Sequence, residues 1–215
     1  MADERAMPWP ELKRSMVAIL RGVRPDEIEA VAAVLIEAGF EAIEVPLNSP
    51  EPFVSIEKAV KLAPANCLIG AGTVLEAAAV HRVADAGGRL VVSPNVVPQV
   101  IARAVEHRMV SVPGVFTATE ALLAIGAGAS GLKFFPASVL GPSGIKAIRA
   151  ILPGGIEISA VGGISESDFA SYAAAGIRTF GLGTSLYQPG ASAEVIGKKA
   201  RAMVAAYDAA FGSWT

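Results

Sequence analysis

The sequence predicts an α/β protein with a single (β/α)₈ TIM barrel, and three observations lead to that fold class. Short apolar runs alternate with Ala-rich amphipathic segments eight times along the 215 residues. No β-hairpin signal separates the runs, which is typical of parallel βα units. The alternation continues to the last helix without a change in composition, which favours a barrel over a doubly wound sheet, the other fold that fits. We therefore expect one domain over residues 1–215.

Each predicted strand is one of the short apolar runs. The eight runs lie at 16–20, 42–46, 67–72, 90–94, 109–113, 131–135, 156–161 and 179–183. Helical segments follow them near 25–38, 50–63, 76–86, 97–107, 117–126, 142–151, 165–175 and 192–210. Capping residues precede several of these segments and a glycine follows several others. We also expect a short N-terminal helix over 8–14 that closes the bottom of the barrel.

The composition excludes several classes of protein. Hydrophobic residues make up 53% and charged residues 18%, which provides a large core and argues against disorder. The net charge is −2 without a long run of either sign, so we expect no nucleic-acid partner. One cysteine and two distant histidines predict neither a disulfide nor a metal site, and we expect no cofactor. No signal peptide or membrane span is predicted, so a cytoplasmic location is the expectation.

Lys133 stands in the middle of the apolar run GLKFF. Lysine is almost never fully buried unless its charge is used or paired. Side chains alternate along a barrel strand, so Lys133 faces inward if Leu132 and Phe134 face the helices. The same reasoning turns Glu44 of AIEVP inward. Both residues lie near the carboxyl ends of their strands, where barrel enzymes place their sites. A buried ion pair is the structural alternative, although such pairs stabilise poorly against apolar replacements.

A lysine beside a carboxylate suits Schiff-base chemistry. A desolvated amine with a depressed pKa attacks a ketone, and the protonated imine then withdraws electrons from a neighbouring C–C bond. A carboxylate moves protons to and from the intermediates. We predict that Lys133 is the nucleophile and Glu44 the general acid and base. Two alternatives are a metal-free sugar-phosphate isomerase or epimerase and a non-catalytic phosphosugar-binding barrel.

Glycine-rich loops follow the last two predicted strands, in AVGGIS and GLGTSLY. Loops at this place in a barrel form a recurring phosphate site, because free backbone N–H groups gather there. The predicted phosphate-binding residues are Gly162, Gly163, Gly183 and Thr184. The alternative is that these glycines only form tight turns.

Two further residues stand at the predicted mouth of the barrel. Thr73 ends the third strand in GAGTV, and Arg21 follows the first strand in AILRG. Either side chain suits the carboxylate of an acidic substrate. The alternatives are a helix cap for Thr73 and a solvent-exposed loop position for Arg21.

Eight motifs together carry a family resemblance. They are VAILRG, GFEAIEVPLNSPEP, IGAGTVL, VVSPN, PGVFTATEAL, LKFFPAS, IKAIRAILP and AVGGIS, in order over roughly residues 15–210. The sequence resembles the 2-keto-3-deoxy-6-phosphogluconate and 2-keto-3-deoxy-6-phosphogalactonate aldolases. The resemblance implies a homotrimeric class I aldolase without a metal. By position it implies Lys133 as the Schiff-base residue, Glu44 as the acid and base, Thr73 and Arg21 at the pyruvyl site, and both glycine loops at the phosphate.

Two positions bear on the substrate within this family. The gluconate branch typically has an arginine where Asn48 stands and a threonine where Val161 stands. The sequence is similar to the galactonate branch, whose substrate differs from the other in configuration at C4. The resemblance implies cleavage of 2-dehydro-3-deoxy-6-phosphogalactonate to pyruvate and D-glyceraldehyde 3-phosphate. Activity on the gluconate epimer, or on both epimers, is the alternative.

Overall fold

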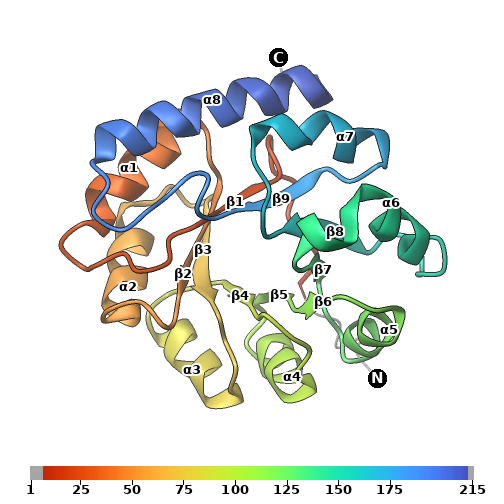
Figure 1. The fold of residues 1–215 in the computed structure, drawn as a ribbon. Coiled ribbons are helices and arrows are strands. Elements are labelled where there is room, and N and C mark those ends of the chain that lie inside the picture. The colour runs from red at the N-terminus through yellow and green to blue at the C-terminus, as the bar shows by residue number, and fades with distance from the viewer. Residues whose placement is uncertain (1–6, 213–215) are drawn as a thin grey trace.

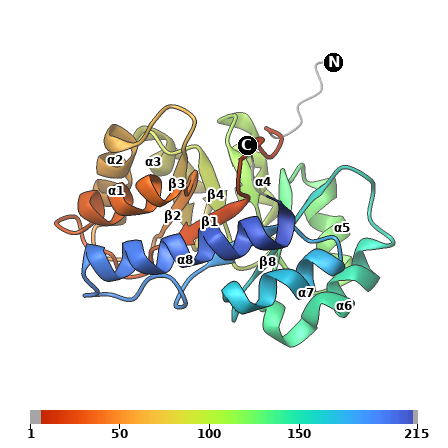
Figure 2. The ribbon, with the colours of Figure 1, turned by 90° about the horizontal axis from the view of Figure 1, so that it is seen from above.

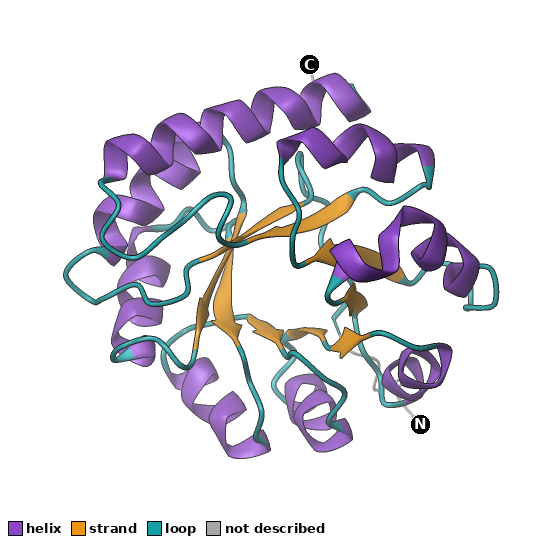
Figure 3. Ribbon diagram, in the orientation of Figure 1, coloured by secondary structure: helices purple, strands orange, loops and turns teal. Residues whose placement is uncertain are grey.

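A ring of parallel strands surrounded by helices forms the computed structural model, which describes residues 7–212 (Figures 1 and 3). The strands are β1 (Met16–Ile19), β2 (Ala42–Pro46), β3 (Leu68–Gly72), β4 (Leu90–Val92), β5 (Val110–Val112), β6 (Gly114–Val115), β7 (Gly131–Phe134), β8 (Glu157–Val161) and β9 (Thr179–Leu182). The helices are α1 (Ile28–Ala38), α2 (Pro52–Leu62), α3 (Ala77–Asp85), α4 (Pro98–Glu106), α5 (Ala118–Gly126), α6 (Ala137–Arg149), α7 (Phe169–Ala174) and α8 (Ala193–Phe211). The predicted α/β barrel is confirmed.

The nine strand segments correspond to the eight predicted barrel strands. Their order in the sheet is β5-β4-β3-β2-β1-β9-β8-β7-β6, so β5 and β6 lie at its two ends. These two segments are consecutive in the chain and are separated only by Pro113, which lacks the N–H that a ladder needs. Backbone hydrogen bonds from Ser130 to Ser111 at 2.8 Å and from Lys133 to Pro113 at 2.9 Å close the ring.

The prediction of a short helix over 8–14 is wrong. This segment has no helical turn, because Pro8 and Pro10 flank Trp9, remove two backbone donors and disfavour helical conformation in the residues before them. The segment still closes the bottom of the barrel. Trp9 and Leu12 pack against the apolar side chains that face inward near the amino-terminal ends of the strands.

Side chains along each strand point alternately into the barrel and out to the helices, which gives two separate apolar clusters. Ile43 and Leu132 face outward and belong to the large cluster between the sheet and the helices. Ala42 faces inward and belongs to the small cluster inside the barrel. This confirms the predicted orientation of β2 and β7, which turns Glu44 and Lys133 into the barrel.

Helix boundaries follow local chemistry. Thr117 and Glu120 form the predicted capping box at the start of α5. Helix α6 begins five residues earlier than predicted, and Gly141 interrupts it with a left-handed φ of 68° immediately before Pro142. The early turn brings Ser138 to the glycine loop after β8, where its backbone N–H donates to Gly162 at 3.1 Å.

The long helix α8, near the carboxyl terminus, contacts residues near the amino terminus. It lies beside α1 and α7 (Figures 1 and 2). The hydroxyl of Tyr207 accepts from the backbone of Ser15 at 3.2 Å and donates to the carbonyl of Arg178 at 3.1 Å. Arg14 pairs with Asp208 at 2.7 Å. Across residues 7–212, no helix is long and apolar enough to cross a membrane.

Candidate active site

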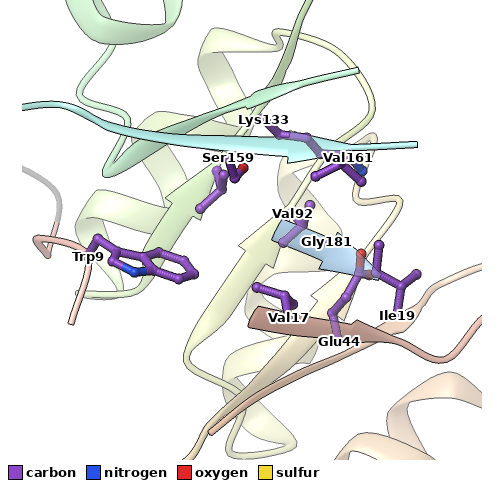
Figure 4. Close-up of a pocket in the computed structure, with 10 residues that line it drawn as sticks. Trp9, Val17, Ile19, Glu44, Val92, Lys133, Ser159, Val161 and Gly181 are labelled. Atoms are coloured by element: carbon purple, nitrogen blue, oxygen red, sulfur yellow. The ribbon is translucent and has the colours of Figure 1, made fainter. Parts of the chain in front are cut away.

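Lys133 and Glu44 lie at one cavity inside the barrel. Lys133 on β7 is 6% exposed, and Glu44 on β2 is 2% exposed. Both side chains line the cavity together with mostly apolar groups, among them Val17, Val92 and Val161 (Figure 4). The two ionisable residues predicted to face inward therefore line one largely apolar cavity.

Burial shifts the pKa of both groups toward their uncharged forms. Desolvation raises the pKa of Glu44, and the nearby charges of Lys133 and Arg21 oppose that rise. Desolvation lowers the pKa of Lys133, Glu44 opposes that change, and Arg21 adds to it. The cavity therefore favours a neutral amine, the form that attacks a carbonyl carbon. The Nζ atom also lies 5.0 Å from the centroid of the Phe135 ring, within range of a cation–π contact.

The carboxylate of Glu44 is incompletely satisfied. Its Oε2 atom is buried and has no hydrogen-bond partner among the described residues. A buried polar atom without a partner costs free energy, and such atoms gather where a ligand supplies the missing bond. The free oxygen suits proton exchange with a substrate held in the cavity.

A second pocket opens from Lys133 to the mouth of the barrel. It is open to solvent. Its lining includes eight of the residues predicted for the site: Arg21, Thr73, Lys133, Val161, Gly162, Gly163, Gly183 and Thr184. The barrel thus brings the predicted nucleophile, carboxylate-binding and phosphate-binding residues to one pocket. Val161 lines this pocket as well as the inner cavity.

Arg21, Asn48 and Thr73 connect three loops at the mouth. The Arg21 guanidinium donates to Asn48 Oδ1 at 2.6 Å and to Thr73 Oγ1 at 3.3 Å. Asn48 is exposed and is absent from the pocket lining, and its side chain contacts the lining residue Arg21. The alternative of Thr73 as the cap of α3 is wrong, because Glu76 holds that position. Thr73 has a φ of 55°, a left-handed conformation that is rare for a β-branched residue.

The loop after β8 needs glycine at two consecutive positions. Gly162 and Gly163 have φ values of 92° and 73°, which side chains disfavour. A Cβ atom at Gly163 would lie 2.5 Å from Ser138 Oγ. Among residues 7–212, the backbone N–H groups of Gly163 and Thr184 donate to no acceptor. These N–H groups are available for an anion at the pocket.

Ser159 and Trp9 are among the residues of the inner cavity that were not predicted from the sequence. Ser159 on β8 is the register partner of Lys133, and its hydroxyl donates to the carbonyl of Leu132 at 3.1 Å. Trp9 lines the cavity from the amino-terminal segment (Figure 4). Strand register and the path of an irregular segment place these side chains, and neither produces a pattern in a single sequence.

Comparison with known proteins identifies the family of this chain. The family model described as "Aldolase: KDPG and KHG aldolase" matches residues 11–200. A probable 2-dehydro-3-deoxy-6-phosphogalactonate aldolase of Rhizobium meliloti (strain 1021) is 66% identical over 206 residues, which cover 96% of this chain and 97% of the relative. The 2-dehydro-3-deoxy-6-phosphogalactonate aldolase of Escherichia coli (strain K12) is 46% identical over 201 residues, which cover 94% and 98% of the two chains.

A solved structure described as native KDPGal gives a TM-score of 0.92 at 46% identity, with 95% of this chain and 98% of that chain covered. The sequence match and the structural match both extend over nearly the whole barrel, including the strands that carry Lys133 and Glu44. The chain therefore belongs to the KDPG and KHG aldolase family and is a carbon–carbon lyase.

Proposed function

We propose that this chain cleaves 2-dehydro-3-deoxy-6-phosphogalactonate to pyruvate and D-glyceraldehyde 3-phosphate through a Schiff base on Lys133. The observation that carries the proposal is a buried lysine and a buried carboxylate, that of Glu44, on the wall of one cavity in an aldolase barrel. Membership of an aldolase family counts against the isomerase and the non-catalytic binding barrel.

The first half of the reaction forms the imine. The neutral amine of Lys133 attacks C2 of the keto acid, and a C–N bond forms as the carbonyl oxygen takes up a proton. Glu44 in its acid form protonates the carbinolamine hydroxyl, which leaves as water. Burial raises the pKa of Glu44, which favours the acid form that donates this proton.

The second half breaks the C3–C4 bond. The Glu44 carboxylate, directly or through a water molecule, takes the proton of the C4 hydroxyl. The C3–C4 electron pair moves toward the iminium nitrogen, which gives an enamine and releases the phosphorylated aldehyde. Glu44 then returns the proton to C3, and water hydrolyses the imine to pyruvate and free Lys133.

The two charged ends of the substrate have separate binding groups. Arg21 and Thr73 hold the carboxylate beside C2, since they lie at the mouth with Lys133. The backbone N–H groups of the two glycine loops, with the Thr184 hydroxyl, bind the phosphate. Gly162, Gly163, Gly183 and Thr184 form this part of the pocket.

We propose Val161 and Asn48 as the positions that set the preference for the galactonate epimer. Val161 lies beside Lys133 in both cavities and has no hydroxyl to offer to the C4 oxygen. Asn48 orients Arg21 through the 2.6 Å hydrogen bond. Both relatives described above are named as galactonate-type aldolases, which supports this epimer. Assays of the two epimers side by side test the preference.

We further propose that residues 1–215 form one catalytic domain that assembles as a homotrimer. Large apolar side chains are exposed at the rim of the barrel mouth, where Leu75, Phe116 and Val139 follow β3, β6 and β7. Exposed apolar side chains of this kind suit contacts between subunits. Analytical ultracentrifugation tests the homotrimer.

A cytoplasmic location fits a phosphorylated substrate, whose charge keeps it inside the cell. Cell fractionation tests this location.

Borohydride reduction in the presence of pyruvate is the test of the mechanism. The expected result is a reduced pyruvyl adduct on the peptide that carries Lys133, found by mass spectrometry. No adduct on a protein that still binds phosphosugars would overturn the Schiff base. An adduct on another lysine would overturn the assignment to Lys133.

A further inference from the structure

The carboxylate of Glu44 occupies the place where a side chain at residue 72 would lie. A Cβ atom added to Gly72 would lie 1.3 Å from Glu44 Oε2 and 2.3 Å from its Cδ atom. Ordinary contacts between non-bonded heavy atoms are about 3.5 Å. Any residue with a side chain at position 72 therefore competes with the Glu44 carboxylate for the same volume.

Strand register explains this proximity. Strands β2 and β3 are parallel, with Glu44 opposite Gly70 and Pro46 opposite Gly72. Register partners share a face of the sheet, so both glycines face the barrel interior with Glu44. Glu44 extends along this face toward the mouth, and its carboxylate lies over Gly72 (Figure 4 shows Glu44 at the cavity).

The two glycines of β3 have different reasons to lack a side chain. A Cβ atom at Gly70 would lie 2.0 Å from the backbone oxygen of Leu90, so Gly70 lets β3 and β4 approach each other. The three atoms nearest to a Cβ at Gly72 all belong to the carboxylate of Glu44. Gly72 is not among the residues with positive φ, so its backbone conformation accepts alanine.

We propose that Gly72 is a positioning residue: its missing side chain fixes where the Glu44 carboxylate lies relative to the imine on Lys133. This inference rests on the proposed role of Glu44 in proton transfer. With alanine at residue 72, the carboxylate oxygen has to move by roughly 2 Å to reach an ordinary contact. A displacement of about 1 Å at a reacting group can reduce the rate about 100-fold.

The test is a Gly72→Ala variant assayed alone and combined with Glu44→Asp. We expect the single Gly72→Ala change to lower kcat about 100-fold and to move the acid limb of the kcat–pH profile. Pyruvate and borohydride should still label Lys133. The Glu44→Asp change shortens the side chain by one methylene and withdraws its carboxylate from the contested volume. Adding Gly72→Ala to Glu44→Asp should therefore lower kcat by no more than about 3-fold.

Gly126→Ala is the matched control, because a Cβ atom there meets no atom within 4 Å. Its kcat should equal that of the wild type. Wild-type kcat and an unchanged pH profile in Gly72→Ala would overturn the proposal. An equal loss in both backgrounds would also overturn it, since the damage would then come from the backbone or from neighbouring Thr73.

Two further results distinguish an error in the proposed role of Glu44 from an error in the proposed role of Gly72. Wild-type turnover in Glu44→Gln would refute the proposed role of Glu44, whereas an impaired Glu44→Gln beside a fully active Gly72→Ala would refute only the role of Gly72. Circular dichroism reports the fold of every variant. If Gly72→Ala unfolds and the double variant folds, the collision with Glu44 is supported. If both unfold, residue 72 serves the backbone and the proposal is wrong.

Discussion

Replacement of Lys133 by methionine should abolish catalysis and preserve the fold. Methionine is an unbranched side chain of similar length, but it has no amine to form the C–N bond. The position is 6% exposed and faces a mostly apolar cavity, which accepts a thioether. The Lys133→Met variant therefore separates the chemical role of the residue from its role in packing.

The expected effect on rate is large and the effect on stability is small. Removal of a nucleophile that acts together with other catalytic groups can cost about 10⁶ in kcat, so we expect a loss of at least about 10⁴-fold. Replacement of a whole buried ion pair by apolar residues is often neutral or stabilising by about 1–4 kcal/mol, whereas removal of one partner costs about 3–5 kcal/mol when it leaves the other charge buried and unpaired. Burial raises the pKa of Glu44 and Lys133 opposes that rise, so the Lys133→Met change should raise this pKa further and favour the uncharged acid, which avoids the unpaired charge.

Turnover is measured as pyruvate release coupled to lactate dehydrogenase, and stability by urea denaturation followed by circular dichroism. Lys146→Met on the exposed face of α6 is the control and should have wild-type kcat. A folded Lys133→Met protein that retained more than about a tenth of the wild-type kcat would refute the covalent mechanism. A loss of more than about 4 kcal/mol in unfolding free energy would show that the amine also stabilises the barrel.

Three further predictions concern the other residues of the site. Glu44→Gln should lower kcat about 10²- to 10⁴-fold. Because burial raises the pKa of Glu44, the folded wild type retains a proton that the unfolded chain releases, and its stability falls as pH rises through that window. Glu44→Gln has no such proton to lose, so its unfolding free energy minus that of the wild type should be larger at about pH 8 than at about pH 5. The same difference at the two pH values would contradict the pKa shift. Thr184→Val should raise KM for the phosphorylated substrate about 10-fold and leave borohydride trapping of pyruvate unchanged; an unchanged KM removes the hydroxyl from the phosphate site. Val161→Thr should raise kcat/KM for the gluconate epimer relative to the galactonate epimer by about 10-fold, and an unaltered ratio would exclude this position as a determinant.

Several features of the structure follow from local sequence alone. The two-residue period of a strand and the apolar residues around Lys133 and Glu44 determine that both side chains face inward. That orientation needs only the alternation of side chains along a barrel strand. The capping pair Thr117 and Glu120 likewise fixes the start of α5 from residues three positions apart.

The sequence predictions failed where a local pattern competes with another constraint. A helix was expected over 8–14 to close the bottom of the barrel, and the two prolines beside Trp9 prevent it. A short apolar segment still finds a place to pack, because the open bottom of the barrel exposes inward-facing valines and leucines.

Only the tertiary structure brings the remaining parts of the site together. Strand register places the carboxylate of Glu44 over Gly72 and places Ser159 opposite Lys133. Closure of the barrel gathers the loops that carry Arg21 and Thr73, and it buries the side chains of Glu44 and Lys133. That burial raises the pKa of Glu44 and lowers the pKa of Lys133. Sequence patterns determine which way each side chain points along its own strand, whereas the distances between strands and the burial of these two groups depend on contacts between residues far apart in the chain.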